Sequence, residues 1–538
     1  MKRLSEFLGS FAAPVALAAA TALCLCFAAV WFGGLNQDEG WYLYAAQMVR
    51  SGYMPYRDFF YTQGPAMPFV YSVLSPLWGR GALLQGLLGG RIVTLAFGLL
   101  GGVCAVALAR RLVPRPRRGV AGLTVFALLL CNLYHLYFVT IPKTYALGGL
   151  FVMAGFLLVA RGLESGGPAA VRPTCLFAGG LSLAFATGTR ISLLLILPVV
   201  GVTLLVRFRE FRWSFLVFGL GGALGLALTY GVFALDPESL RGLLAAQRYH
   251  AARGGFDPFF VIGSVSRLAR GYVALGVVLF AVPLLRRWNG VASEAEGRGA
   301  AAGAVAWMLG LGFAAVFALQ LSAPFPYDDY QVPVMPILAV LAAALFARSV
   351  PEGASGRAAW FVALTAAATS FASPLLQEWA TFSNDRFWSQ KKEMTELAKL
   401  RLVGRDVEAL DPGGRDILTQ DLYLAVETGR AVPRGLEMGP FSYFPDLPTD
   451  EARAVHVLNR ELMDRLIDSA PCAIAACSGY AFAIAAPHCD ETPFEEQRRY
   501  FKELDRRYEP VYREIGFGQN ATTLLVYRRR PSEKEAQR

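Results

Sequence analysis

The stretch NQDEGWYLYAAQMVRSGYMPYRDFFYTQGP, residues 36–65, decides how the chain folds. It follows an apolar run at residues 11–33 that is long enough to cross a bilayer. Asp38 and Glu39 stand side by side where the lipid would end, and aromatic residues and a Gly-Pro break follow them. A carboxylate at the hydrocarbon boundary is costly unless it is paired, hydrated or used in chemistry. A plain membrane anchor needs none of these features, so the stretch indicates an elaborate outer loop.

The composition divides the chain into a membrane part and a soluble part. The 538 residues are 55% hydrophobic and 17% charged, whereas a soluble domain carries about 25% charge. Long apolar runs fill residues 1–375, and charged residues are spread through residues 376–538. We therefore predict a polytopic α-helical membrane domain at residues 1–375, with outer loops at residues 34–83 and 235–265. Residues 376–538 are expected to form an extracytoplasmic α/β soluble domain of ordinary size.

About eleven transmembrane helices are expected, since a span needs about 20 apolar residues. The expected spans are residues 11–33, 84–109, 119–141, 143–160, 174–188, 190–206, 213–234, 266–285, 300–320, 331–348 and 358–375. The first of them follows Met1–Arg3 as in a signal peptide, but no small-residue cleavage site precedes Asp38, so we expect the span to be retained.

Arginine is concentrated in alternate joints between these spans, which predicts the orientation of the chain. Five successive joints contain Arg110, Arg111, Arg115, Arg117 and Arg118; Arg161 and Arg172; Arg207, Arg209 and Arg212; Arg286, Arg287 and Arg298; and Arg348 and Arg357. By the positive-inside rule these joints and the N-terminus are cytoplasmic. An odd number of spans in the cytoplasmic (inner) membrane then places the C-terminal domain in the periplasm or outside the cell. The basic joints account for much of the net charge of +10, so we exclude nucleic acid as a partner.

Local patterns predict the elements of the outer segments. The sequences WYLYAAQMVRSG and FVYSVLSPLWG in the first outer loop are expected to be helices lying along the membrane interface. In the outer domain we expect a strand at Asp416–Thr419 that leads into a helix ended by Gly429, strands at Ala473–Ala476, Ala481–Ala486 and Thr522–Tyr527, and a helix at Glu495–Arg507. An oxidising compartment allows one disulfide among Cys472, Cys477 and Cys489, and the sequence does not indicate which pair forms it.

Asp38 has two readings at this stage. In the first, Asp38 and Glu39 are hydrated interface residues that mark the end of the first span. In the second, Asp38 faces an aqueous pocket and accepts a proton from a hydroxyl that attacks a sugar, or holds that hydroxyl in place.

Three motifs resemble one family. The Asp-Glu pair directly after the first span resembles the acidic signature of the GT-C superfamily of membrane glycosyltransferases. The following MPYRDFFYTQGPAMPFVYSVL resembles the same loop in the dolichyl-phosphate-mannose–protein mannosyltransferase-like branch, which includes the bacterial aminoarabinose transferases. The stretch SAPFPYDDYQVPVMPILAVLAA is similar to the aromatic- and proline-rich segment before a late span of that branch. The likeness covers roughly residues 30–350.

The resemblance implies a reaction and a set of partners. Members of the family pass a sugar from a polyprenyl-phosphate carrier to a glycolipid, glycan or protein acceptor on the outer side of the bilayer, usually with inversion. Asp38 and Glu39 are the expected catalytic residues. Arg190 and Lys143 lie at outer turns and are the expected carrier-phosphate ligands, although relatives often have an acid near the position of Lys143. For both cations, anchoring to lipid headgroups is the alternative.

Further outer residues are expected to contact the sugar or the acceptor. They are Tyr42, Arg57, Asp58, Tyr249, His250, Tyr327, Asp328 and Tyr330. For Arg57 and Asp58 a structural ion pair is the alternative, and for the aromatic residues an interface belt. Some relatives bind a divalent metal ion through a loop acid and a histidine, which makes Glu39 and His250 the candidate ligands if a metal is used.

Two other functions compete with the transferase. A transporter or flippase of lipid-linked saccharides is expected to have polar or broken spans near mid-membrane, often in two related halves. A membrane-tethered binding protein does not need so many spans. The transferase hypothesis predicts one outward-facing cavity walled by Asp38, Arg190 and residues 235–265.

Overall fold

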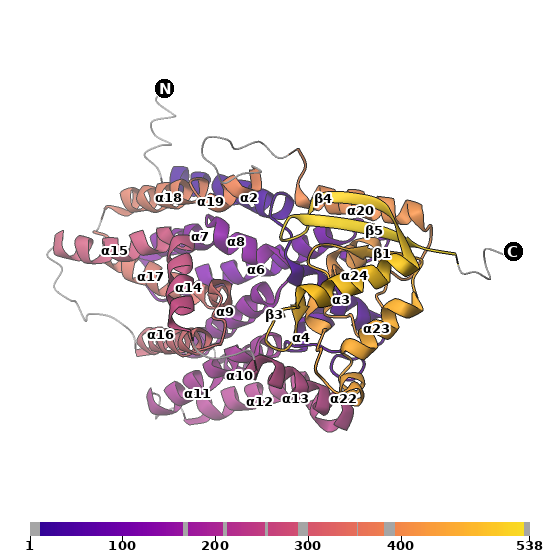
Figure 1. Ribbon diagram of the computed structural model, residues 1–538. Helices are drawn as coiled ribbons and strands as arrows, with labels where there is room; N and C mark the ends of the chain where they lie inside the picture. Colours follow the sequence, from indigo (N-terminus) through magenta and orange to yellow (C-terminus); the bar gives the residue numbers. More distant parts are fainter. Residues whose placement is uncertain are drawn as a thin grey trace. The chain divides into compact units, whose positions relative to one another are not determined.

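The computed structural model consists of two compact units, and each is described by itself (Figure 1). It describes residues 11–164, 171–207, 212–252, 257–288, 300–351, 353–380 and 393–531. Unit 1 comprises Met1–Val30, Thr94–Tyr230 and Phe256–Lys391. Unit 2 comprises Trp31–Val93, Gly231–Gly255 and Lys392–Arg538.

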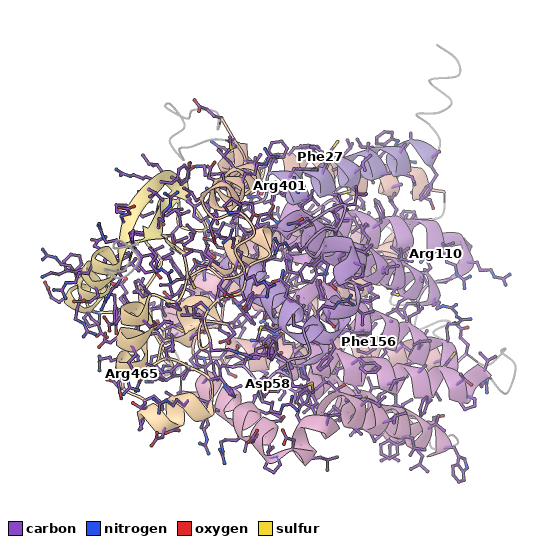
Figure 2. The ribbon with its side chains drawn as sticks, turned by 90° about the vertical axis from the view of Figure 1, so that its right-hand side faces the viewer. Phe27, Asp58, Arg110, Phe156, Arg401 and Arg465 are labelled. Atoms are coloured by element: carbon purple, nitrogen blue, oxygen red, sulfur yellow. The ribbon has the colours of Figure 1, made fainter. Side chains whose placement is uncertain are left out.

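Unit 1 is built from apolar helices. They are α2 (Ala12–Trp31), α6 (Leu87–Arg111, which begins in unit 2), α7 (Arg118–Leu130), α8 (Leu133–Thr140), α9 (Thr144–Gly162), α10 (Val171–Thr189), α11 (Ile196–Arg207), α12 (Arg212–Leu235, which ends in unit 2), α14 (Pro258–Gly271), α15 (Val273–Trp288), α16 (Ala300–Leu321), α17 (Met335–Ser349), α18 (Ser355–Phe371) and α19 (Pro374–Ala380). Short 3-10 turns are η1 (Arg115–Arg117), η2 (Ile191–Leu195) and η4 (Asp328–Gln331). Phe156 of α9 is fully buried among these helices (Figure 2).

Close packing in unit 1 depends on small residues. A Cβ atom added to Gly155 of α9 would lie 2.7 Å from Leu183 of α10, and one added to Gly179 of α10 would lie 2.8 Å from Val159 of α9. Small residues let neighbouring apolar helices approach closely, which replaces the hydrophobic driving force that lipid does not supply.

Among the described residues, five helices are long and apolar enough to cross a membrane, or seven if each bent pair counts as one span. All eleven expected spans are helical, but some are shorter than a full span or bent. Residues 119–141 bend by 66° between α7 and α8, where the Asn132 side chain accepts a hydrogen bond from the His135 N–H at 3.0 Å and so begins a new helix. The span expected at residues 266–285 divides at Tyr272, with a bend of 80° between α14 and α15.

Unit 2 mixes helices with a small sheet. Its helices are α3 (Gln37–Arg50), α4 (Ala66–Val73), α5 (Ser75–Trp78), α13 (Pro237–Ala251), α20 (Glu396–Leu410), α21 (Leu422–Thr428), α22 (Thr449–Ala454), α23 (Arg460–Ser469) and α24 (Phe494–Arg507), with a 3-10 turn η5 (Gly439–Ser442). Its strands are β1 (Ile474–Cys477), β2 (Ile484–Ala485), β3 (Asp490–Glu491), β4 (Tyr508–Phe517) and β5 (Thr522–Arg529). The main sheet has the antiparallel order β1-β5-β4. The predicted class, a polytopic α-helical membrane protein with a C-terminal α/β domain, is confirmed.

Several predicted elements of the C-terminal segment are found, with three differences. The strand expected at Asp416–Thr419 is reduced to two isolated bridges, Asp416 with Ala431 and Leu418 with Ala475. Gly429 ends α21 in the left-handed conformation, at φ +64°, as expected for a helix-terminating glycine. The strand expected at Ala481–Ala486 is reduced to the two residues of β2. The ten-residue strand β4 was not predicted.

Helix α3 of the first outer loop packs inside unit 2. Ten of its 14 residues are buried, so it does not present the single apolar face of the interface helix that we expected. Gly40 lies directly against α21: a Cβ atom there would be 2.3 Å from the backbone N of Tyr423. The buried carboxylate of Asp421 accepts hydrogen bonds from Tyr423 Oη at 2.9 Å and from Ser478 Oγ at 2.9 Å. Residues 31–93 therefore share one core with residues 392–531.

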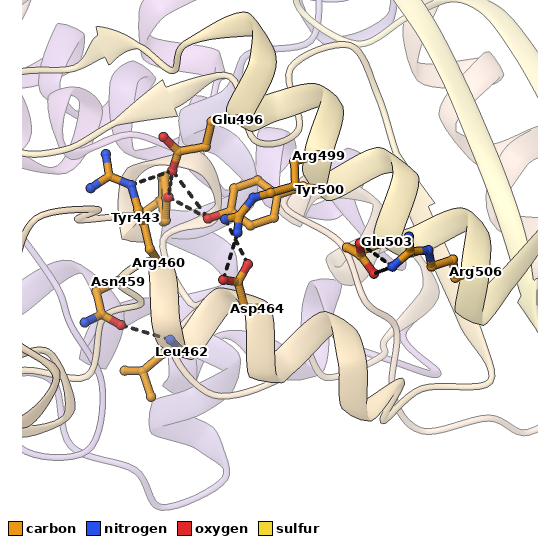
Figure 3. A network of polar contacts seen from close by, with 10 residues as sticks. All are labelled: Tyr443, Asn459, Arg460, Leu462, Asp464, Glu496, Arg499, Tyr500, Glu503 and Arg506. Carbon is orange, nitrogen blue, oxygen red and sulfur yellow. Dashed lines mark hydrogen bonds and ion pairs between the residues drawn. The ribbon is translucent and has the colours of Figure 1, made fainter.

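A polar network joins α23 and α24 (Figure 3). Tyr443 and Tyr500 share a hydrogen bond of 2.6 Å between their hydroxyl oxygens, and Glu496 accepts from Arg460 Nε at 3.0 Å. Arg499 of α24 pairs with Asp464 of α23 at 3.0 Å. Cys472 and Cys477 are free thiols in the structure, and the Cys489 sulfur lies 3.3 Å from the Tyr249 hydroxyl.

Candidate active-site residues

Glu39 is neutralised by a buried arginine. Arg91 donates from Nε to Glu39 Oε2 at 2.7 Å and from Nη2 to Glu39 Oε1 at 2.7 Å, and both side chains are fully buried. Arg91 also donates to the carbonyl oxygens of Gly33 and Gly34, at 2.9 and 3.0 Å. The Asn36 N–H donates to Glu39 Oε1 at 3.0 Å, which completes a capping box at the start of α3. Both Glu39 oxygens are therefore engaged in holding the turn that leads out of the first span.

Asp38 lies in a different environment from Glu39. It is half-buried, and its Oδ1 accepts a hydrogen bond from the Trp41 indole N–H at 3.0 Å. The ring of Trp41 stacks on Tyr42 with centroids 3.6 Å apart, and Tyr61 meets Trp41 edge-on at 5.7 Å. All three rings are buried, so Tyr42, which was predicted to contact the sugar, serves packing beside Asp38.

The second outer loop packs against the first within unit 2. Phe233, at the end of α12, meets Tyr56 edge-on at 5.1 Å. Tyr249 of α13 meets Phe60 edge-on at 6.1 Å, and its hydroxyl lies 3.3 Å from the Cys489 sulfur. The structure thus brings residues of the loops 34–83 and 235–265 together within unit 2. Tyr249 itself is buried, so its ring serves this packing.

Arg57 and Asp58 form the ion pair given as their structural alternative. The guanidinium binds the carboxylate through Nη2–Oδ2 at 2.9 Å and Nε–Oδ1 at 3.2 Å. The Met54 N–H donates to Asp58 Oδ2 at 2.7 Å, so the pair closes a tight turn. The carbonyl oxygen of Asp58 accepts from Arg434 Nη1 at 3.0 Å, and that of Arg57 accepts from His456 Nε2 at 2.5 Å.

In unit 1, two adjacent acids each hold a cation. Asp329 accepts from Lys143 Nζ at 2.9 Å, and both side chains are largely buried. Asp328 accepts from Arg267 Nε at 2.8 Å and from the Tyr134 hydroxyl at 2.6 Å. Asp328, predicted to contact sugar, therefore positions an arginine and a tyrosine, and Lys143 has an acidic partner after all.

Arg190 lies in an aromatic cage beside this pair. Its guanidinium is 4.4 Å from the ring centroid of Tyr330 and 5.3 Å from that of Tyr145. Cation–π contacts of this kind fix the orientation of an arginine without neutralising its charge. Tyr327 is 45% exposed and packs edge-on against Tyr330, with centroids 5.6 Å apart.

The residues proposed for a metal ion do not form a ligand set. The Glu39 oxygens are bonded to the Arg91 guanidinium, whose positive charge opposes a cation. The His250 side chain lies outside the described residues. Within the described part of the chain, no three His, Cys, Asp or Glu side chains are grouped so that they could hold a metal ion. We derive no step through a metal.

The whole chain superposes on a known membrane protein of the same size. The crystal structure of ArnT from Cupriavidus metallidurans in the apo state matches with a TM-score of 0.64 and 15% identity, over 95% of this chain and 97% of ArnT. The structure of the same protein bound to undecaprenyl phosphate matches with a TM-score of 0.62 and 14% identity, again over 95% and 97%. The chain has the ArnT fold. No protein-family model and no curated protein matches this sequence.

The likeness to ArnT is one of fold, and it agrees with the architecture that the sequence resemblance implied. Sequence reasoning missed four residues that contact the predicted site residues within each unit: Arg91 and Trp41 in unit 2, and Arg267 and Tyr145 in unit 1. Arg91 could have been found from the sequence, because an arginine inside an expected apolar span needs a buried partner. Tyr145 and Arg267 carried none, because their contacts with Asp329 and Asp328 join segments more than 60 residues apart.

Proposed function

We propose that the chain is a glycosyltransferase that moves a sugar from a polyprenyl-phosphate carrier to an acceptor at the outer face of the cytoplasmic membrane. The acceptor is a glycolipid, a glycan or a protein. The ArnT fold supports this proposal, and a solved ArnT structure contains undecaprenyl phosphate. The observation that carries the proposal is the contrast between two adjacent carboxylates.

We use this contrast to assign a structural role to Glu39 and a reactive role to Asp38. Glu39 is buried and neutralised by Arg91, whereas Asp38 is half-buried beside the aromatic rings of Trp41 and Tyr42. Two acids in different environments can take different roles at the same pH. We assign Asp38 to the acceptor hydroxyl and Glu39 to the position of the turn that carries Asp38.

The proposed reaction inverts the anomeric carbon. Asp38 accepts the proton of the acceptor hydroxyl, or holds that hydroxyl, as its oxygen attacks the anomeric carbon. The new carbon–oxygen bond forms on the face opposite the carrier, and the bond to the phosphate oxygen breaks, so the polyprenyl phosphate leaves with the bonding electron pair. The proton then passes from Asp38 to water.

The leaving phosphate needs positive charge, and unit 1 offers three candidates. Lys143 and Arg267 are held by Asp329 and Asp328, and Arg190 is held by aromatic rings. Cations fixed before the reaction stabilise developing charge without reorganising. We propose that these three residues bind the carrier phosphate.

The decisive experiment measures sugar transfer in membranes that contain the full chain, with a panel of polyprenyl-phosphate sugars as donors. Asp38→Asn removes the proton acceptor and keeps the size of the side chain, so we expect a loss of about 100-fold or more in turnover. Lys143→Met and Arg267→Met are expected to raise the KM for the donor. Asp446→Asn, an exposed acid on the C-terminal segment, is the matched control and should retain full activity.

Unchanged turnover in Asp38→Asn would reject the proposed role of Asp38. If no donor is consumed by the wild-type chain, but reconstituted vesicles move a labelled lipid-linked sugar between leaflets, the chain is a flippase and the transferase proposal is wrong.

A further inference from the structure

A cavity of about 400 Å3 lies within unit 2, between the turn at Asp58 and the segment that contains Arg434 and His456. Its size falls in the range of small-molecule sites. None of the residues assigned to proton transfer or phosphate binding lines it. One wall is apolar and is formed by Val457, Leu458 and Leu462.

Glu437 is a buried carboxylate in the wall of this cavity. Its side chain is 2% exposed, and its Oε2 accepts from the Gly435 N–H at 2.7 Å. Its Oε1 accepts no hydrogen bond from any described residue, although Arg434 Nη1 lies 3.6 Å away. A buried polar atom without a hydrogen bond is rare and costly. We therefore expect Oε1 to accept a hydrogen bond from a donor such as a ligand hydroxyl.

Arg434 and Arg453 lie at the rim of the cavity, and their ion pairs with Glu437 and Asp450 are long, at 3.6 and 4.0 Å. Arg434 stacks on Tyr53 at 4.2 Å, which orients its guanidinium. Arg453 is half-exposed, and its ion pair with the fully exposed Asp450 spans 4.0 Å. An exposed pair at that distance contributes little and is easily exchanged for another anion.

His456, at the same rim, has an unusual backbone conformation. Its φ is +60°, a left-handed conformation that is uncommon outside glycine. Its Nε2 donates to the Arg57 carbonyl oxygen, which fixes the ring against the first outer loop. Such strain persists only where the surrounding structure holds it, and it is frequent at ligand sites.

We infer that this cavity binds a sugar that carries a phosphate or carboxylate group. The anion would contact Arg453 and the side of Arg434 that faces the cavity, and a sugar hydroxyl would donate to Glu437 Oε1. The C–H face of the ring would lie on Val457, Leu458 and Leu462. Assigning this sugar to the acceptor of the transfer reaction rests on the proposed function, whereas binding itself does not.

The test uses isothermal titration calorimetry to measure the binding of glucose 1-phosphate to the full-length chain in detergent. Glucuronate tests the carboxylate form, and glucose and inorganic phosphate each supply one half of the ligand. We expect glucose 1-phosphate or glucuronate to bind more tightly than either half. Arg453→Ala should weaken binding about tenfold or more, because a charge-assisted hydrogen bond is lost. At a pH above the pKa of about 7 of this carboxyl, Glu437→Gln should weaken it as well, since Oε1 loses its negative charge.

Arg465→Ala is the matched control, because this exposed arginine lies on α23 well apart from Asp58 (Figure 2). Its affinity should equal that of the wild type. Equal binding by Arg453→Ala and Arg465→Ala, or binding of inorganic phosphate as tight as that of glucose 1-phosphate, would overturn the inference. Asp38→Asn should bind the probe normally, so that a failed transfer reaction and an empty cavity are told apart.

Discussion

At the scale of single residues, the buried pair of Glu39 and Arg91 is expected to dominate the stability of the first outer loop. Glu39→Gln leaves the buried Arg91 guanidinium without its carboxylate partner, while its bonds to the carbonyls of Gly33 and Gly34 remain. Breaking a buried pair on one side typically costs about 3–5 kcal/mol. We expect a clearly lower unfolding temperature, measured by tryptophan fluorescence in detergent.

The double replacement Glu39→Leu with Arg91→Leu is the control for this prediction. Removing both charges avoids an uncompensated ion, so the double variant should be more stable than Glu39→Gln. A Glu39→Gln variant that unfolds at the wild-type temperature would show that the pair contributes nothing to stability.

Glu437 is expected to make stability depend on pH. Burial raises the pKa of this carboxyl from its ordinary value of 4.5 to about 7. Between these values the folded state binds a proton that the unfolded state has lost, so the stabilisation is complete below about pH 4.5 and is lost as the pH rises to about 7. At 1.36 kcal/mol per pKa unit, the loss is about 3 kcal/mol.

The measurement is thermal unfolding between pH 5 and 7.5. Glu437→Gln cannot ionise and should flatten the pH profile, whereas Glu503→Gln, on the surface of α24 beside Arg506, should leave it unchanged (Figure 3). Parallel profiles for wild type and Glu437→Gln would contradict the assigned titration.

Single residues were predicted from sequence where a motif or a charge in an unusual place identified them. Asp38 and Arg190 stood out because they lie at expected membrane boundaries. Arg57 and Asp58 were adjacent, so their ion pair was foreseeable. The pairing of Lys143 with Asp329 was not, because nothing local links residues 186 positions apart.

At the scale of elements, the contact between α3 and α21 is expected to tolerate no side chain at Gly40. A Cβ atom there would lie 2.3 Å from a backbone nitrogen, which cannot move without shifting α21. We expect Gly40→Ala to destabilise unit 2 by about 1–3 kcal/mol, the usual cost of overpacking. Limited proteolysis of the full chain measures this loss.

Gly34→Ala is the comparison for Gly40→Ala, because a Cβ atom at Gly34 meets nothing within 4 Å. It should be neutral. Equal protease resistance of the two variants would mean that α3 and α21 do not pack as described.

Elements were predicted well where their hydrophobic pattern was regular. Apolar runs produced helices at all eleven expected places, but Asn132 bends one of them because its side chain begins a new helix. Strand β4 escaped prediction because YEPVYREIGF contains a proline, a glycine and three charges. Its ladder with β5 has irregularities at Pro510 and Glu514, and tertiary pairing overrides the weak local preference.

At the scale of the whole molecule, the arginine-rich joints predict the orientation of the chain. We expect alkaline phosphatase fused after residue 531 to be active, because this enzyme folds only outside the cytoplasm. A fusion truncated after residue 117, in the first arginine-rich joint, should be inactive. Measuring phosphatase activity in intact cells tests both. An active fusion at residue 117 would reverse the proposed topology.

The division into units was beyond prediction from the sequence. Composition separated residues 1–375 from residues 376–538, whereas the structure places Trp31–Val93 and Gly231–Gly255 in one unit with Lys392–Arg538. This is because the sequence of α3 is about half polar, and its packing partner α21 lies hundreds of residues later in the chain. The hydrophobic pattern of a short sequence window cannot reveal a partner so far along the chain.

This shared core has a consequence for biosynthesis. Gln37 Nε2 lies 3.5 Å from the Asp421 carboxylate, across 384 positions of sequence. At about 5–20 residues per second, a ribosome needs on the order of 20–80 s to add the second partner. During that interval the apolar side chains of the first outer loop lack the residues that later cover them. We therefore expect an export chaperone to bind this loop. A stop codon placed before residue 421 should therefore yield a product that is degraded rather than a stable truncated enzyme.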